Sequence, residues 1–239
     1  MSRKPRYIDP HATVGADRPL PAAGHLHRRR FRMNRHVLSV ALAWFLVTAM
    51  SFGVPSPSSA EDGPAVLQRV LHASGLDQLG TKKRIAFTFH VEAGETNVTR
   101  AWEWNLETDS VRQDGADVGK TPKFINDAYW LLFPAMVAWD QGKVELTAEP
   151  SVIAPLTKQE TTKLVVRYID GVGSTPNDRY DLYVSGEGEV VEWSYYKAGA
   201  EAPTRQTAWG GYEVIGGLRL SLDRPGDGFR VWFTDVVVE

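Results

Sequence analysis

The sequence predicts a mainly β protein of the α+β class, in which a single antiparallel sheet has helices packed over one face. Three observations lead to this prediction. Short segments of alternating apolar and polar residues recur between residues 84 and 238. Turn sequences rich in glycine or proline, such as "SGEGE" and "RPGDG", separate these segments. Only two segments have apolar residues at helical spacing, so strands dominate the fold.

Residues 1–60 differ in charge from the rest of the 239-residue chain. They hold 9 of the 27 Lys and Arg residues but only 2 of the 29 Asp and Glu residues, so the remaining part is acidic. Basic residues, the apolar run "HVLSVALAWFLVTAMSFG" and small residues up to Ala60 are the parts of a secretory signal peptide. We therefore expect residues 33–60 to be a signal peptide cleaved near Ala60, and the mature protein to be periplasmic.

Met33 would by itself begin a normal signal peptide, so residues 1–32 are expected to be a non-native upstream extension. Two alternatives stay open from the sequence. The first is an uncleaved membrane anchor, because the apolar run approaches the roughly 20 residues that span a bilayer. The three arginines at positions 28–30 loosely resemble a twin-arginine export signal, which is the second.

Residues 61–239 are predicted to form one exported domain. A length of roughly 180 residues suits a single core that buries about 70% of the surface of the unfolded chain. The chain has no cysteine, which excludes a disulfide framework and a lipid-modified cysteine after the cleavage site. An acidic domain without clustered Lys and Arg is not expected to bind nucleic acid.

The first elements expected in this domain are an amphipathic helix and a hairpin. Apolar residues at helical spacing in "GPAVLQRVLHAS" predict a helix over residues 63–74. The segment "RIAFTFHVE" alternates between apolar and polar residues and predicts a strand with one buried side. After a turn, "NVTRAWEWN" continues the pattern and places Trp102 and Trp104 on the same face.

The second predicted helix, "FINDAYWLLFP", is apolar on nearly every side. Thr121 can cap it, Pro122 suits its first turn, and Pro134 is expected to end it. Such a helix is buried on most sides or contacts lipid, and about eleven residues are too few to span a bilayer. We therefore expect it to pack over the apolar face of the sheet.

The rest of the chain is predicted to consist of strands and turns that complete one sheet in meander order. Eight strands are expected, at residues 109–114, 143–148, 162–169, 179–184, 188–196, 205–213, 217–222 and 228–238. An open sheet with one apolar face needs a cover, and the two helices are the covers available. An apolar cavity forms wherever they cover the sheet incompletely.

Residues that support catalysis or metal binding are sparse in this domain. His72 and His90 are too few for a histidine-rich metal site, and no nucleophile elbow, phosphate loop or dinucleotide fingerprint occurs. The loop "DGVGSTPND" could hold calcium, although turn hydrogen bonds explain its composition more simply. We expect no catalytic residue, no metal and no cofactor. Asp178 and Asp181 are the acidic pair that a hydrolase would use.

Aromatic residues are the remaining unusual feature of the sequence. Seven of the eight Trp residues lie in residues 61–239. They either fill the core or line a cavity between the second helix and the sheet. The predicted cavity wall consists of Trp102, Trp104, Tyr129, Trp130, Leu132, Phe133 and Trp193.

Five segments together resemble a known family: "RAWEWN", "INDAYWLLFP", "KLVVRYIDGVGSTPNDRYDLYV", "VVEWSYY" and "FTDVVVE". They are similar to uncharacterised bacterial exported proteins with the LolA-like fold, that of the periplasmic lipoprotein carrier. The resemblance covers most of residues 62–239. It implies an antiparallel half-barrel whose concave apolar face is closed by helices and sequesters acyl chains. None of the five segments is a catalytic signature.

The leading functional hypothesis is a periplasmic, non-enzymatic protein that binds or carries a lipid or another apolar small molecule in a half-barrel cavity. The export signal, the apolar sheet face and the aromatic helix favour it. An alternative is a structural or protein-interaction module of the cell envelope, with a filled core and an envelope protein as its partner. A hydrolase that acts on an envelope polymer is the third hypothesis.

Overall fold

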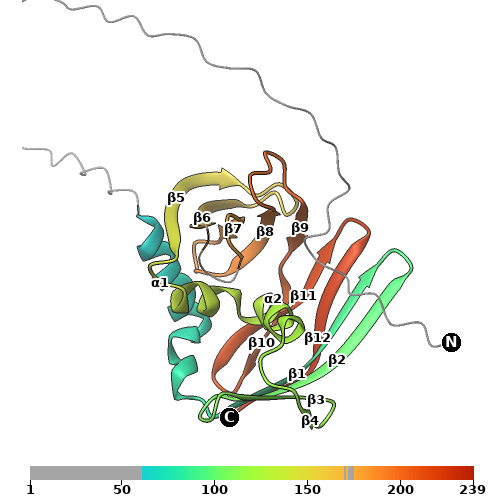
Figure 1. Cartoon of the computed structure of the whole chain (residues 1–239). Coiled ribbons are helices and arrows are strands. Elements are labelled where there is room, and N and C mark those ends of the chain that lie inside the picture. Colours follow the sequence, from blue (N-terminus) through green and yellow to red (C-terminus); the bar gives the residue numbers. More distant parts are fainter. Residues whose placement is uncertain (1–60, 170, 172–174) are drawn as a thin grey trace, which may run out of the picture. The chain divides into compact units, whose positions relative to one another are not determined.

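The structure is a computed structural model that describes residues 61–169, 171 and 175–239 (Figure 1). The upstream extension and the signal peptide expected within residues 1–60 lie outside the described residues, as does part of the loop "DGVGSTPND". Antiparallel strands make up most of the described chain and α-helices pack against them, so the predicted fold class is confirmed. Within the described residues, no helix has both the length and the hydropathy needed to cross a membrane.

The described residues form two sheets and three helical segments. The helical segments are α1 (Gly63–Ser74), the 3-10 helix η1 (Leu76–Thr81) and α2 (Pro122–Trp139). A seven-stranded sheet contains, in spatial order, β10 (Gly210–Ile215), β11 (Leu218–Gly226), β12 (Phe229–Val238), β1 (Arg84–Ala93), β2 (Thr96–Asn105), β3 (Ser110–Gln113) and β4 (Ala116–Asp117). A five-stranded sheet contains β5 (Val144–Ile153), β6 (Glu160–Tyr168), β7 (Arg179–Val184), β8 (Val190–Tyr196) and β9 (Arg205–Ala208).

The chain passes from the five-stranded to the seven-stranded sheet at Trp209. The sequence predicts one strand over residues 205–213, whereas the structure divides it into β9 and β10. Gly211, just after the division, has a φ of +59°, which glycine adopts without strain. Strands β9 and β11 still lie side by side. A Cβ built on Gly226 of β11 would be only 2.5 Å from the carbonyl oxygen of Gln206 in β9, which shows how closely the two strands approach. The strands therefore form two adjoining sheets in place of one unbroken sheet.

Helix α1 begins and ends where local sequence signals place it. The Asp62 carboxylate accepts a hydrogen bond from the Ala65 amide at 2.9 Å, and Gly75 ends the helix with a φ of +67°. The predicted first helix is thus confirmed. Its buried side packs on the five-stranded sheet and on α2, and Gly63 meets the backbone of Leu146 in β5.

Helix α2 begins as predicted but does not end at Pro134. The Thr121 hydroxyl accepts a hydrogen bond from the Phe124 amide at 3.2 Å, and a proline occupies the first turn. The helix then continues through Pro134 to Trp139, a length of 18 residues. Leu132 departs from helical geometry, with φ −119° and ψ 22°, so the proline kinks the helix without ending it. The prediction that Pro134 closes the helix was wrong.

The hydrophobic core lies between the inner faces of the two sheets, and α2 runs through it (Figure 1). One continuous apolar cluster joins both sheets to α1 and α2. Strand β1 shows the alternation that produces this cluster, since Ile85, Phe87, Phe89 and Val91 are buried and the residues between them are more exposed. Every side of α2 therefore meets apolar partners, as its sequence requires.

A Gly63→Ala variant tests the close packing of α1 on β5. The added Cβ would lie 2.5 Å from the Leu146 carbonyl carbon, so backbone must move and we expect the free energy of unfolding to fall by about 1–3 kcal/mol. Gly80→Ala is the matched control, because a Cβ at this position has no atom within 4 Å. Urea unfolding followed by circular dichroism measures both variants, and equal stabilities would contradict the packing.

Candidate ligand-binding interior

The beginning of α2 packs on the seven-stranded sheet through an aromatic group. The Phe124 ring contacts the rings of Trp102 and Trp104 of β2, and its centroid is 5.4 Å from each of theirs. All three rings are buried. Their edge-to-face arrangement is the one that aromatic pairs favour, so this group attaches the first turn of the helix firmly to β2.

A second aromatic group lies further along α2 and faces the five-stranded sheet. Trp130 and Phe133 contact Trp193 of β8, with ring centroids 4.6 Å and 5.2 Å away. Phe133 also lies 4.6 Å from the Tyr180 ring of β7, and Trp130 lies 5.6 Å from the Phe229 ring of β12. The helix thus uses different sides to bind different sheets, which explains the absence of a polar side.

All seven residues predicted to line a cavity are buried in this interior, with exposed fractions between 0% and 7%: Trp102, Trp104, Tyr129, Trp130, Leu132, Phe133 and Trp193. The structure divides them between two groups. The two residues of β2 belong to the group around Phe124, and the other five surround or adjoin the second group. Because these side chains contact one another directly, they occupy the space between α2 and the sheets in this conformation.

Asp127 places a fully buried carboxylate on α2. It accepts hydrogen bonds from Nε and Nη2 of Arg100, both at 2.6 Å, and from Nε1 of Trp102 at 2.7 Å. Burial raises the pKa of the Asp127 carboxyl, and the Arg100 guanidinium opposes this effect. A buried carboxylate needs such charge-assisted partners, so these bonds fix the first half of α2 to β2.

Arg224 of β11 is fully buried beside the kink of α2. Pro134 has no N–H group, so the carbonyl of Trp130, four residues earlier, has no donor within the helix. Arg224 Nη2 donates to this carbonyl oxygen at 3.1 Å, and Nη1 donates to the Ser221 hydroxyl. The guanidinium also lies 3.7 Å from the centre of the Trp209 ring. Burial lowers the pKa of Arg224 to about 9, so the group is still charged at neutral pH.

A tyrosine pair connects α2 to β6. The Tyr129 and Tyr168 hydroxyls share a hydrogen bond at 2.7 Å, in which one donates to the other. Oδ2 of Asp140 lies 3.1 Å from both oxygens and accepts from the hydroxyl whose proton is left. Lys143 donates to the other oxygen of the same carboxylate at 2.9 Å. Burial raises the pKa of Tyr168 above its ordinary value, so its hydroxyl stays protonated and continues to act as a donor.

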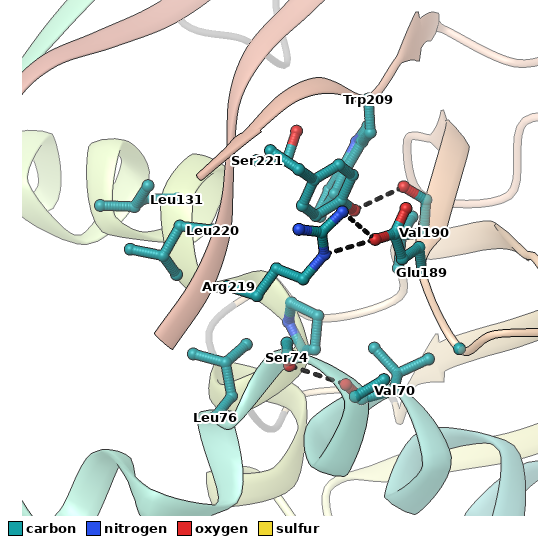
Figure 2. A pocket seen from close by; sticks show the side chains of 14 residues that line it. Val70, Ser74, Leu76, Leu131, Glu189, Val190, Trp209, Arg219, Leu220 and Ser221 are labelled. Atoms are coloured by element: carbon teal, nitrogen blue, oxygen red, sulfur yellow. Dashed lines mark hydrogen bonds and ion pairs between the residues drawn. The ribbon is translucent and has the colours of Figure 1, made fainter. Parts of the chain in front are cut away.

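A small cavity lies next to the kink of α2, between α1 and β11 (Figure 2). Its volume of about 20 Å³ suffices for about one water molecule. Leu131 and Pro134 of α2 form part of its wall, opposite Val70 of α1 and Leu220 of β11. Figure 2 also shows the ion pair between Arg219 and Glu189 at its edge. Packing around the kink is therefore incomplete on this side of the helix.

A larger cavity of about 340 Å³ lies between α1 and the start of β5. Leu67, Val144 and Leu146 supply much of its apolar lining. Its volume falls at the lower end of the range of small-molecule sites. None of the predicted wall residues lines it, so it is separate from the aromatic interior.

The acidic pair considered for a hydrolase does not converge. Asp178 accepts a hydrogen bond from the Tyr195 hydroxyl at 3.0 Å, whereas Asp181 forms an ion pair with Arg179 and is in register with Ser194. Ser194 and Tyr195 are consecutive strand residues and point to opposite faces of the sheet. The two carboxylates therefore lie on opposite faces. In the described part of the chain, no group of three or more His, Asp or Glu residues is arranged to hold a metal ion.

Sequence reasoning identified the aromatic residues of the interior but missed the polar ones. Asp127 did offer a signal, because a carboxylate inside an otherwise apolar helix requires a buried partner. Arg100 occupies an ordinary position of an alternating strand, and nothing nearby in the sequence marks it. Arg224 is separated from Trp130 by 94 residues, so only the fold brings the guanidinium to the kink.

Comparison with known proteins finds likeness in structure alone, since no protein-family model and no curated protein matches this chain. A DUF1329 family protein from Desulfovibrio piger is 10% identical over 74% of this chain and 92% of its own, with a TM-score of 0.46. A LolA superfamily protein from Nitrosomonas europaea is 8% identical over 72% and 93%, with a TM-score of 0.45. A Vibrio parahaemolyticus domain described as an outer membrane lipoprotein-sorting protein is 7% identical over 72% and 92%, with a TM-score of 0.41.

A double-mutant cycle tests whether Arg224 compensates for Pro134. Arg224→Met leaves the Trp130 carbonyl without a donor, so we expect the free energy of unfolding to fall by about 1–3 kcal/mol. Adding Pro134→Ala supplies a helical N–H to that carbonyl and should restore about 1 kcal/mol in the Arg224→Met background. In the wild-type background Pro134→Ala brings no such gain, because the carbonyl already has a donor. Additive effects in chemical unfolding would show that the two residues are not coupled.

Proposed function

We propose that this protein has a non-enzymatic role and binds a lipid or another apolar small molecule in the interior between α2 and the sheets. The observation that carries this proposal is the middle of α2, where residues 127–135 are all buried, aromatic side chains face both sheets and the helix is kinked. The proposal places the mature protein in the periplasm, as the export signal within residues 1–60 predicts.

The break at Leu132 gives α2 a point at which it can bend. A continuous helix resists bending because each turn is hydrogen-bonded to the next, whereas the Pro134 ring removes one of these bonds. The small cavity beside Leu131 and Pro134 leaves space for a displacement at the same point. Movement of this part of the helix would separate Trp130 from Trp193 and expose an aromatic surface to a ligand.

Apolar contacts are well suited to such an exchange. Most of the stabilisation from the contacts between Trp130, Phe133 and Trp193 is burial of apolar area, which an acyl chain can also provide. The part that depends on the edge-to-face geometry of the rings is lost in such an exchange. Burial of the chain itself contributes about 25 cal/mol per Å² before the costs of association. The net affinity would thus come from ligand surface that is removed from water.

Tryptophan fluorescence tests where a ligand enters. Titration with oleate should shift the emission of the wild-type protein, because the environment of Trp130 and Trp193 changes. Trp130→Phe and Trp193→Phe keep an aromatic ring and should each lose much of the shift. Trp232→Phe is the control, because Trp232 stacks on His90 on the outer side of β12. Its shift should equal that of the wild type.

Native mass spectrometry of protein purified from its own periplasm complements the titration. A bound lipid that is released by solvent extraction would support the proposal. Protein that is reproducibly empty, and that also shows no emission change with oleate, would rule it out.

A second candidate function, a protein-interaction module of the cell envelope, is favoured by the exposed end of α2. Trp139 is 50% exposed and packs edge-to-face on Trp104, with ring centroids 5.8 Å apart. Val118 and Ile125 are also large apolar residues with exposures of 40% and 38%. Exposed aromatic residues are common at protein interfaces.

Trp139→Ala separates the two functions. If Trp139 contacts an envelope protein, affinity capture of the wild type should recover that protein and the variant should lose it, while bound lipid is unchanged. Stability should change little, because half of the side chain is already exposed. Capture that is the same for both proteins would argue against a contact at this position.

A further inference from the structure

Five polar atoms on the inner strand faces have no hydrogen-bond partner among the described residues. They are Nε of Arg205 and of Arg224, Nε1 of Trp193 and of Trp209, and Oγ1 of Thr207. Four of the five are N–H donors that cannot accept a hydrogen bond. Buried donors without acceptors are rare in folded proteins because each costs the full desolvation of the group. Three further atoms without a hydrogen-bond partner belong to Arg179, Asp181 and Glu192, so most of the unpaired donors lie on the inner faces.

Three of these five groups belong to residues on the inner face of β8 and β9. Trp193 and Thr207 are directly paired across the two strands, and Arg205 lies two residues before Thr207 on the same face. Paired side chains have Cβ atoms about 4.5–5.5 Å apart, and alternate residues of a strand are about 7 Å apart. The three side chains are therefore near enough to one another for one ligand group to lie among them.

The charge of this region favours an anion. Arg205 has no ion pair with any described residue, and its guanidinium lies 3.8 Å from the centre of the Phe229 ring. Burial lowers the pKa of Arg205, as expected for a cation placed among apolar groups. A carboxylate or a phosphate would supply both the missing acceptors and the missing negative charge. Arg205 is only half-buried, so such a group can approach it from solvent.

Aromatic residues continue from these donors towards α2. The Phe229 ring beneath Arg205 is 5.6 Å from the Trp130 ring, which in turn is 4.6 Å from the Trp193 ring. The donors therefore border the second aromatic group, where the proposed function places the apolar part of the ligand. A molecule with an acidic head and an apolar chain matches both regions at once.

We propose that Arg205, Thr207 and Trp193 bind the carboxylate or phosphate head group of an anionic amphiphile whose chain lies against Trp130 and Phe229. This inference rests on the proposed function and adds the charge of the ligand and its direction, with the head at β9 and the chain towards α2. Trp209 lies beside the site, 6.0 Å from the Trp193 ring, and Arg224 lies behind it. The Arg224 charge increases the positive potential at the head group.

Calorimetric titration with laurate and with dodecanol tests the head-group site, because the two ligands have the same chain length and differ in charge. The wild type should bind laurate at least about tenfold more tightly than dodecanol. Arg205→Gln should lose this preference while its affinity for dodecanol stays the same. Arg112→Gln on β3 is the control, since it removes the same charge from the other sheet, at a half-exposed side chain on a strand that does not adjoin β9. Circular dichroism confirms that each variant is folded.

Lauryl phosphate provides a third ligand and distinguishes the two acidic head groups, since tighter binding of one identifies the preferred acid. Equal wild-type affinities for laurate, lauryl phosphate and dodecanol would overturn the inference and leave the proposed function intact, with water as the occupant of the donors. A preference for acids that survives Arg205→Gln would also overturn it. Failure to bind any of the three ligands would overturn both the inference and the proposed function.

Discussion

A helix that crosses an apolar interior has to satisfy its own backbone, and α2 cannot do so because Pro134 withholds one N–H group. The carbonyl of Trp130 is left in a buried position without this donor. Arg224 supplies the missing donor and brings a positive charge into the core with it. That charge in turn requires the Trp209 ring and the Ser221 hydroxyl around it. The hydrogen bond from Arg224 to Trp130 thus connects the kink of α2 to β11. Trp209, the residue at which the sheets divide, packs on the same guanidinium.

Polar contacts fix α2 at a few points, and aromatic contacts fill the rest. Asp127 binds β2, Tyr129 binds β6 and the Trp130 carbonyl binds β11. These contacts are directional and set the position of the helix. The rings between them contribute mainly buried apolar area, with edge-to-face geometry at several pairs.

Much of the fold follows from local sequence patterns, since alternation predicts the strands and the Asp62 cap predicts the start of α1. Local rules failed where a distant residue changed the outcome. Pro134 ends a helix in isolation, but Arg224 allows α2 to continue, and no pattern in the sequence pairs these two positions. The burial of the candidate wall residues was predictable because large apolar and aromatic side chains are commonly buried in folded proteins. Their division between two sheets depends on the path of α2, which periodicity alone does not determine.

The division of the sheets at Trp209 has a mechanical consequence. Strand pairing in the described residues stays within each sheet, so no ladder of hydrogen bonds crosses from one to the other. A rotation of one sheet against the other would therefore break no strand ladder. The contacts that resist it are those of α2, which is hydrogen-bonded to strands of both sheets and so acts as a brace between them.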